Sequence, residues 1–130
     1  MDAMNIEIAQ RFADAWVADW NSHDLDRILS HYTDDFEMTS PAISVTGFGD
    51  SGKLEGKSNV GDYWRAALDR VPDLLFTLKG VFCGVNSVVI YYEGPLGMGA
   101  EVFEFNEDGK VFRAFANYEG FIAAISKLAG

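Results

Sequence analysis

The feature that most constrains this fold is a change of hydrophobic period within residues 21–41. The first half has apolar residues at helical spacing: Leu25, Ile28, Leu29 and Tyr32. Ser22 or Asp24 can accept the first free backbone N–H groups of that helix. The second half has a period of two until Pro41 ends it, and one face carries Phe36, Met38 and Ser40. The stretch predicts a short amphipathic helix followed directly by a strand.

This stretch also carries a family resemblance. Residues 20–41 read W-N-x-H-D-L-D-x-I-L-x-x-Y-x-D-D-F-x-x-x-x-P, which resembles the second helix and first strand of the SnoaL-like branch of the NTF2-like (cystatin-like) superfamily. The resemblance covers about residues 8–119. It implies a cone-shaped α+β fold with three N-terminal helices packed on a curved, mainly antiparallel sheet. The superfamily includes steroid isomerases, polyketide cyclases, dehydratases, epoxide hydrolases and non-catalytic binding domains, so the fold alone does not determine a reaction.

The rest of the chain fits this order of elements. Helical spacing predicts a helix at about residues 5–20, with Trp16 and Trp20 on its apolar face, and another at 57–71, which Pro72 ends. Antiparallel strands are predicted at 74–83, 88–93, 98–105 and 110–119. Residues 41–56 lack a period and are expected to form a long loop, a candidate flexible lid. A short terminal helix is predicted from Phe121, Ile122, Ile125 and Leu128.

Length and charge limit the classes of partner. The 130 residues suffice for one core and are too few for two, so we expect a single domain over residues 1–130. Twenty acidic against ten basic residues give a net charge of -10, which disfavours nucleic acid and anionic membranes as partners. Because the chain has neither a secretory leader pattern nor a run of about 18 apolar residues, we expect a cytoplasmic protein. The single cysteine, Cys83, excludes an internal disulfide.

The resemblance implies three positions for a catalytic site. In ketosteroid-isomerase relatives the pocket combines a carboxylate base on the first strand, a tyrosine donor on the first helix and a protonated acid on a later strand. By register, these positions are occupied here by Ser40, Trp16 and Glu101. Serine cannot remove a carbon-bound proton unaided, and an indole N–H is a weaker donor at a different point. Tyr32 and Trp64 match positions that carry supporting tyrosines in such enzymes.

Glu101 is anomalous by pattern alone. With a period of two, it shares a strand face with Phe103 and Phe105. Burial on that face would raise the pKa of its carboxyl and leave it a proton donor, or a base near neutral pH. Alternatively, the hairpin twists and Glu101 reaches solvent near Gly97 and Gly99.

The last strand shows a related pattern. By parity, Ala114, Ala116 and Tyr118 share a face with Phe112, and the small residues would leave a cavity that Tyr118 rims. Glu119 stands where some SnoaL-like relatives carry a functional carboxylate. Its parity directs it away from the glutamate of the preceding strand, so it is a reserve candidate only.

Other patterns are weaker. His23 and His31 lie near several aspartates, but neither belongs to a helical core stripe, so solvated helix ends are favoured over a metal site. Cys83 closes an apolar strand, which favours a small core residue over a nucleophile. Residues 47–53 are glycine-rich without the ending or context of a phosphate loop, and Asp50 would repel phosphate.

The sequence supports two hypotheses. The first is an enzyme that acts on a small, apolar carbonyl compound by proton transfer, as an isomerase, cyclase or lyase, with Glu101 as acid or base and without cofactor or metal. Its binding residues would be Trp16, Tyr32, Ser40, Trp64, Phe103 and Tyr118. The second is a non-catalytic module that binds an apolar ligand or serves as a homodimeric scaffold, which Ser40 at the base position favours.

A homodimer is common in the resembled family and is expected here. The last two strands place a mixed apolar and charged set on the face away from the helices: Val102, Glu104, Arg113, Phe115 and Asn117. Such a face can pair with a copy of itself. We therefore expect association through the outer sheet face.

Overall fold

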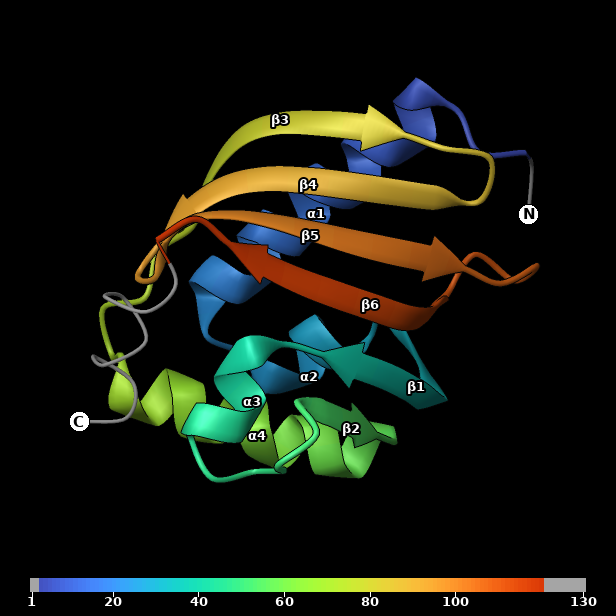
Figure 1. Cartoon of the computed structure of the whole chain (residues 1–130). Helices are drawn as coiled ribbons and strands as arrows, with labels where there is room; N and C mark the ends of the chain where they lie inside the picture. Colours follow the sequence, from blue (N-terminus) through green and yellow to red (C-terminus); the bar gives the residue numbers. More distant parts are fainter. Residues whose placement is uncertain (1–2, 121–130) are drawn as a thin grey trace.

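The structure is a computed structural model that describes residues 3–120. Its helices are α1 (Ile6–Ser22), α2 (Leu25–Leu29), α3 (Pro41–Val45) and α4 (Lys57–Arg70). Its strands are β1 (Tyr32–Thr39), β2 (Lys53–Glu55), β3 (Thr77–Cys83), β4 (Ser87–Gly94), β5 (Gly97–Phe105) and β6 (Val111–Tyr118). They form one sheet in the order β2-β1-β6-β5-β4-β3, in which only β1 and β6 run parallel (Figure 1). The expected α+β fold with a mainly antiparallel sheet is confirmed.

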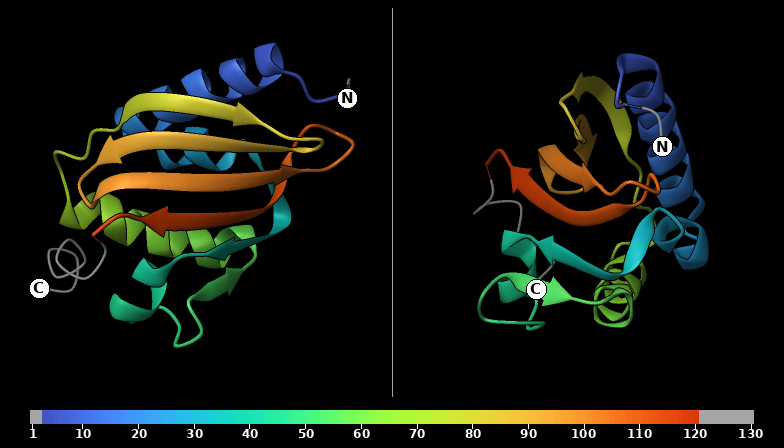
Figure 2. Two further views of the ribbon diagram at one scale, coloured as in Figure 1. Left: turned by 45° about the horizontal axis from the view of Figure 1, so that its top comes forward. Right: turned by 90° about the vertical axis from the view of Figure 1, so that its right-hand side faces the viewer.

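Helix α1 covers strands β3–β6, and α4 lies behind β1 and β2 (Figure 1). The side chain of Asn5 caps α1 by accepting a 2.9 Å hydrogen bond from the backbone N–H of Ile8. The buried residues of α1 follow helical spacing and form one stripe: Ala9, Ala13, Trp16 and Trp20. Figure 2 shows the same layering from two further directions. No helix within residues 3–120 is long and apolar enough to span a bilayer.

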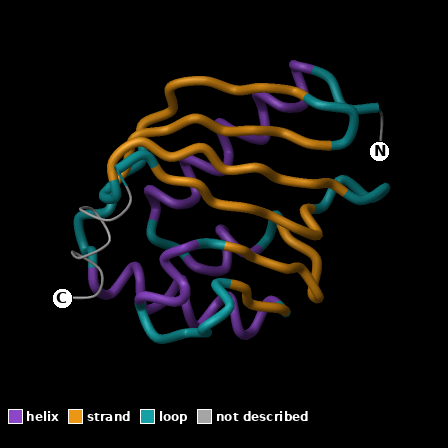
Figure 3. The backbone as a smooth tube through the Cα atoms, viewed as in Figure 1, coloured by secondary structure: helices purple, strands orange, loops and turns teal. Residues whose placement is uncertain are grey.

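The switch from helix to strand within residues 21–41 is confirmed. Asp24 caps α2 by accepting a hydrogen bond from Arg27 N, and β1 begins only three residues after α2 ends. The buried positions of β1 alternate as expected, and Pro41 follows the strand as the first residue of α3. The tube in Figure 3 shows this change of structure and the curved strands in front of the helices.

The expectation of a structureless loop at residues 41–56 is wrong. The segment contains α3, which Ser40 caps by accepting a 3.2 Å hydrogen bond from Ala42 N, and β2, whose Leu54 pairs with Met38 of β1. These elements have five and three residues. Neither is long enough to display a hydrophobic period, so the pattern could not reveal them. The expected terminal helix at 121–128 lies outside the described residues.

The expected inward position of Phe112 in β6 and the expected burial of Cys83 in β3 also need correction. The pairing of β5 with β6 shifts between Glu104 and Phe105, so Val111 is buried in place of Phe112. Phe112 instead packs under the guanidinium of Arg113, 5.4 Å from its ring centroid. A β-bulge of this kind inverts the parity of the residues before it. Cys83 is exposed and not a core residue, because it ends the edge strand β3.

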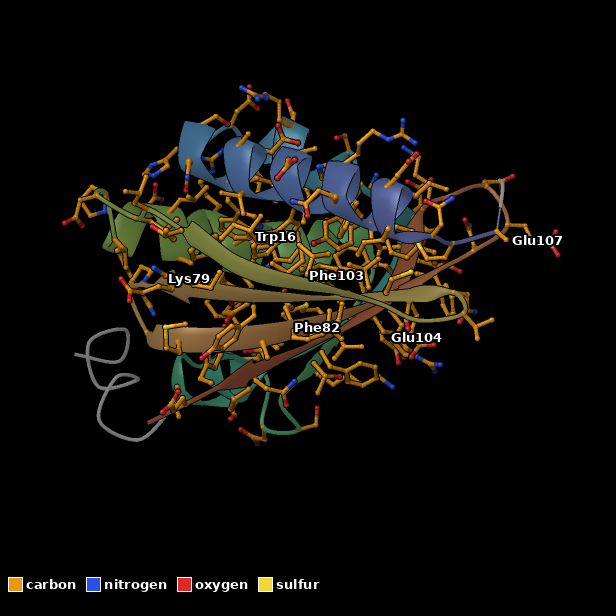
Figure 4. All side chains as sticks on the ribbon, turned by 90° about the horizontal axis from the view of Figure 1, so that it is seen from above. Trp16, Lys79, Phe82, Phe103, Glu104 and Glu107 are labelled. Carbon is orange, nitrogen blue, oxygen red and sulfur yellow. The ribbon has the colours of Figure 1, made fainter. Side chains whose placement is uncertain are left out.

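The core lies between α1 and the inner face of the sheet. Phe12 of α1 contacts Phe103 and Phe105 of β5 edge to face, each at a centroid distance of 4.9 Å. Figure 4 shows Trp16 and Phe103 between the helix and the sheet, whereas Phe82 and Glu104 extend from the opposite face.

Candidate functional site

A cavity of about 70 Å³ lies at one end of this aromatic layer. Its walls come from α1, α4, β1, β4, β5, β6 and the segments that join them, and seven of the sixteen lining residues are aromatic: Trp16, Trp20, Tyr63, Trp64, Phe76, Tyr92 and Tyr118. Among residues 3–120, Glu101 is the one acidic residue in this wall. An aromatic cavity with few polar groups is the usual form of a small-molecule site.

Glu101 is buried, with only 5% of its surface exposed. The alternation of β5 directs it inward, between Ile90 of β4 and Ala116 of β6. The Tyr92 hydroxyl donates a 3.2 Å hydrogen bond to its Oε1 atom. Burial raises the pKa of Glu101 to about 7, because desolvation disfavours the charged form, and the bond from Tyr92 opposes this rise.

Further hydroxyls surround this carboxyl. Tyr63 and Tyr118 line the same cavity as Tyr92 and Glu101. Ser40 is only 1% exposed and lies behind the cavity wall. The serine hydroxyl at the end of β1 accepts the 3.2 Å hydrogen bond from Ala42 N that caps α3.

Burial keeps these tyrosines neutral. It raises the pKa of Tyr63 to about 12 and raises the pKa of Tyr92 and Tyr118 well above the ordinary value, and the charge of Glu101 adds to each rise. A neutral phenol can donate a hydrogen bond. The site thus combines one carboxyl that titrates near neutral pH with several hydroxyl donors that do not.

The sequence-predicted site residues fall into two groups. Four line the cavity: Glu101, Trp16, Trp64 and Tyr118. The other three are buried behind its wall: Ser40, Tyr32 and Phe103. The Tyr32 hydroxyl accepts a 3.1 Å hydrogen bond from the indole Nε1 of Trp16, so that donor is already engaged within the protein. Phe103 is completely buried and packs against Trp16 with ring centroids 5.5 Å apart.

Sequence reasoning missed Tyr63 and Tyr92. Tyr92 lies directly opposite Gly99, and the missing side chain there makes room for its ring. A tyrosine on the inner face of β4 was readable from parity with Val88 and Ile90. Tyr63 belongs to the buried face of α4, but helical spacing alone does not distinguish it from a core aromatic.

The weaker candidates lie elsewhere. His23 bonds the carbonyl oxygen of Leu74 at 2.7 Å, and His31 bonds Asp19 at 2.6 Å. Within residues 3–120, no three His, Cys, Asp or Glu side chains are grouped as metal ligands. Residues 47–53 join α3 to β2 and so lack the strand-to-helix setting of a phosphate loop. Glu119 is exposed.

The fold and the buried cavity define an α+β protein of the NTF2-like, or cystatin-like, class. The chain belongs to the SnoaL-like family, because residues 13–114 match the SnoaL-like domain. A SnoaL-like protein of unknown function from Burkholderia thailandensis is 47% identical. Its structure covers 92% of this chain and 100% of its own, with a TM-score of 0.87.

More distant structures share the fold. A candidate isomerase of the SnoaL-like family from Agrobacterium tumefaciens is 18% identical, with a TM-score of 0.71, over 88% of this chain and 100% of its own. TerC, crystallised with polyporic acid, is 16% identical, with a TM-score of 0.74, over 92% and 98%. At these identities the likeness concerns the fold alone. No protein of curated function matches the chain in sequence.

Proposed function

We propose that this protein is a cofactor-independent enzyme that catalyses proton transfer on a small, apolar carbonyl compound, as an isomerase, cyclase or lyase. The observation that carries the proposal is Glu101, a buried carboxyl in an aromatic cavity whose pKa is raised to about 7. A general base or acid is most effective when its pKa lies near the working pH.

The chemistry follows from the two kinds of polar group in the cavity. The Glu101 carboxylate takes a proton from a carbon beside the carbonyl, and the electron pair of that C–H bond forms a C=C bond. The carbonyl π pair moves to the oxygen, where the neutral tyrosine hydroxyls can stabilise the growing negative charge. Return of the proton to a different atom completes an isomerisation, and loss of a leaving group makes the reaction a lyase.

The size of the cavity limits the substrate. A volume of about 70 Å³ is roughly half that of an engineered apolar cavity that holds benzene. A steroid nucleus therefore does not fit. We infer a compound whose carbonyl and neighbouring carbons alone enter the aromatic pocket.

Deuterium exchange tests the proposal without knowledge of the natural substrate. Acetone, which has only a carbonyl and its two neighbouring carbons, is incubated with the protein in deuterium oxide near neutral pH, and loss of its α-proton signal is followed by NMR. We expect catalysed exchange that Glu101→Gln slows at least about 100-fold, the usual lower contribution of a general base. Glu104→Gln is the matched control, because Glu104 lies on the same strand and binds Arg113 on the opposite face. Equal rates in Glu101→Gln and wild type would refute the proposal.

One observation favours the second candidate, a non-catalytic binding module. Ser40 stands at the base position of ketosteroid-isomerase relatives, and its hydroxyl is already engaged as the cap of α3. The same assay separates the candidates. A binding module shifts the protein resonances on addition of acetone but leaves the rate of exchange at the level of buffer.

We propose further that two copies pair through the outer sheet face. Support comes from an apolar row that crosses four strands in register: Phe82, Val89, Val102 and Phe115. Phe82 is 61% exposed, and an exposed apolar row is a common feature of association surfaces. Sedimentation equilibrium should give a dimer mass that Phe115→Glu converts to a monomer mass. A monomer at every concentration of the wild type would contradict this proposal.

A further inference from the structure

The three tryptophans of the chain all line the cavity that contains Glu101: Trp16 and Trp20 of α1 and Trp64 of α4. Trp20 and Trp64 meet edge to face with ring centroids 5.2 Å apart. Phe76, another lining residue, is stacked on Trp16 at 5.2 Å and lies 5.5 Å from Trp20. The rings therefore form one continuous aromatic cluster in the cavity wall.

The charge available in this cavity is negative. The Glu101 carboxyl is buried in the wall and accepts a 3.2 Å hydrogen bond from the Tyr92 hydroxyl. Within the described part of the chain, no lysine, arginine or histidine lines the cavity. A buried carboxylate without a positive partner is unfavourable. A ligand that carries a positive charge into the cavity would remove this cost.

An aromatic wall around an anionic group suits the recognition of organic ammonium ions. The face of an aromatic ring attracts a cation, and tryptophan attracts it most strongly, especially where water is excluded. The N–H groups of an ammonium ion also donate charge-assisted hydrogen bonds to a carboxylate. A neutral ketone gains neither attraction, so both features of the wall favour a cation.

We propose that the cavity binds small organic ammonium ions, with Glu101 as the counterion and the three tryptophans as the cation-binding wall. The inference goes beyond the proposed function and does not depend on it, because binding requires no proton transfer from carbon. The cavity volume of about 70 Å³ limits the ligand to a short-chain amine. The net charge of -10 favours the approach of a cation from solution.

The surroundings make Glu101 the group whose charge changes near neutral pH, because burial raises its pKa to about 7. The wall residues from α1 are tryptophans, and His23 and His31 bond Leu74 and Asp19 elsewhere. An ammonium ion prefers the ionised carboxylate, so its affinity should rise as the pH passes about 7. The other titratable groups that face Glu101 are tyrosines whose pKa is raised by burial, so they remain neutral: Tyr32 of β1, Tyr63 of α4, Tyr92 of β4 and Tyr118 of β6.

The test compares two ligands that share the carbon skeleton of acetone. Isopropylammonium carries a positive charge, and isopropanol has a neutral hydroxyl in its place. Both affinities are measured by NMR titration of the full chain at pH 8.5, in about 0.15 M salt to screen the surface charges. A primary ammonium group titrates near 10.4, as lysine does, so it stays charged at this pH. We expect the ratio of affinities to favour the ammonium ion about tenfold or more.

Two changes remove the charge of Glu101 and should lower this ratio. At pH 5.5 the carboxyl is protonated, and the ratio should be at least about fivefold lower than at pH 8.5. Glu101→Gln keeps the shape of the side chain without its charge, so the ratio should be low at both pH values. Glu104→Gln is the matched control, because Glu104 pairs with Arg113 on the opposite face of the sheet. The wild-type pH profile keeps the test decisive if Glu101→Gln does not fold.

Fluorinated tryptophan tests the aromatic part of the site. Fluorine withdraws electron density from the indole ring and weakens its attraction for a cation, with little change in ring size. Because every tryptophan of the chain lines the cavity, complete replacement by 5,7-difluorotryptophan alters this wall and no other ring. We expect the affinity for isopropylammonium to fall about threefold. The affinity for isopropanol should change little, which also verifies that the cavity still forms.

The outcomes separate this inference from the proposed function. No binding of isopropylammonium, a ratio near one in the wild type at pH 8.5, or a preference that survives both Glu101→Gln and fluorination would overturn the inference. None of these results affects the proposed function, which the exchange of acetone protons decides. If acetone exchanged only at the rate of buffer while the preference for the cation required Glu101, the proposed enzyme would be refuted and the ammonium site would stand.

Discussion

Strand β5 carries two kinds of inner face within a few residues. At its C-terminal end, Phe103 and Phe105 are packed edge to face with Phe12 of α1. Toward its N-terminal end, Glu101 borders a cavity and receives a hydrogen bond from Tyr92. The comparison shows that the fold and the site share one strand but depend on different ends of it.

The difference arises from the residues opposite each position. Phe103 pairs with Val88 and Ala114, and these side chains with α1 leave it no exposed surface. Gly99 pairs with Tyr92 and Tyr118, and the ring of Tyr92 occupies the space that its missing side chain leaves. Close packing stabilises the first end, whereas the second end combines an incompletely filled volume with polar groups, which is costly for stability.

The largest effect is expected at the packed end. Phe103→Ala removes a fully buried ring and should lower the free energy of unfolding by about 3–5 kcal/mol, measured by urea denaturation. Leu75→Ala is the control, because Leu75 is 62% exposed and its loss should cost less than about 0.5 kcal/mol. Similar losses in the two variants would show that this end is not the stabilising one.

A smaller effect on stability, and one that depends on pH, is expected at the cavity end of β5. The pKa of Glu101 rises from 4.5 to about 7 on folding, so the folded state binds its proton more tightly than the unfolded state. This stabilisation is fully present below about pH 4.5 and is lost as the pH rises through about 7. The loss amounts to about 3 kcal/mol, and Glu101→Gln should remove it.

Urea denaturation at pH 5 and pH 8 measures this dependence. The relevant quantity is the difference between wild type and Glu101→Gln, because other groups also titrate in this interval. Glu104→Gln is the control, since Glu104 is an outer-face carboxyl paired with Arg113. The same pH slope in wild type and Glu101→Gln would mean that the carboxyl is hydrated in the folded protein.

The packed C-terminal end of β5 and the order of helices and strands were predictable from the sequence, because the hydrophobic period depends only on neighbouring residues. The helix-to-strand change at residues 21–41 and the inward parity of Glu101 both follow from neighbours in the sequence. The bulge that exchanges Phe112 for Val111 was not predictable, because it depends on how β6 pairs with β5. Segments α3 and β2 were missed because they are shorter than one reliable period.

The cavity end was predictable only in part. Glu101, Trp16, Trp64 and Tyr118 were proposed from pattern and resemblance, and the structure brings them to one cavity. The hydrogen bond from Tyr92 to Glu101 could not be proposed, since the two residues lie on different strands and meet only through the pairing of β4 with β5. No spacing in the sequence encodes such a contact, whereas a single buried acid on an apolar face is visible at once.

The smallest expected loss of stability is that of Gly99→Ala, a substitution that affects both the packing of β5 and the contacts of Glu101. In Gly99→Ala, the new Cβ would lie 2.8 Å from Cζ and 3.0 Å from the hydroxyl oxygen of Tyr92, so the ring must move. We expect a loss of about 1–3 kcal/mol from overpacking. Because the Tyr92 bond lowers the pKa of Glu101, its loss should raise that pKa further, as measured by carbon-13 NMR of the carboxyl.

Gly80→Ala is the matched control on a strand. Its Cβ would meet its nearest neighbour, Cβ of Tyr91, at 3.7 Å, an ordinary contact, so neither stability nor the pKa of Glu101 should change appreciably. If Gly99→Ala lowered stability without moving the pKa of Glu101, the Tyr92 hydroxyl would not be what holds the carboxyl. If the pKa of Glu101 rose in Gly99→Ala but not in Gly80→Ala, the absence of a side chain at Gly99 would account both for the space that Tyr92 occupies and for the pKa of Glu101.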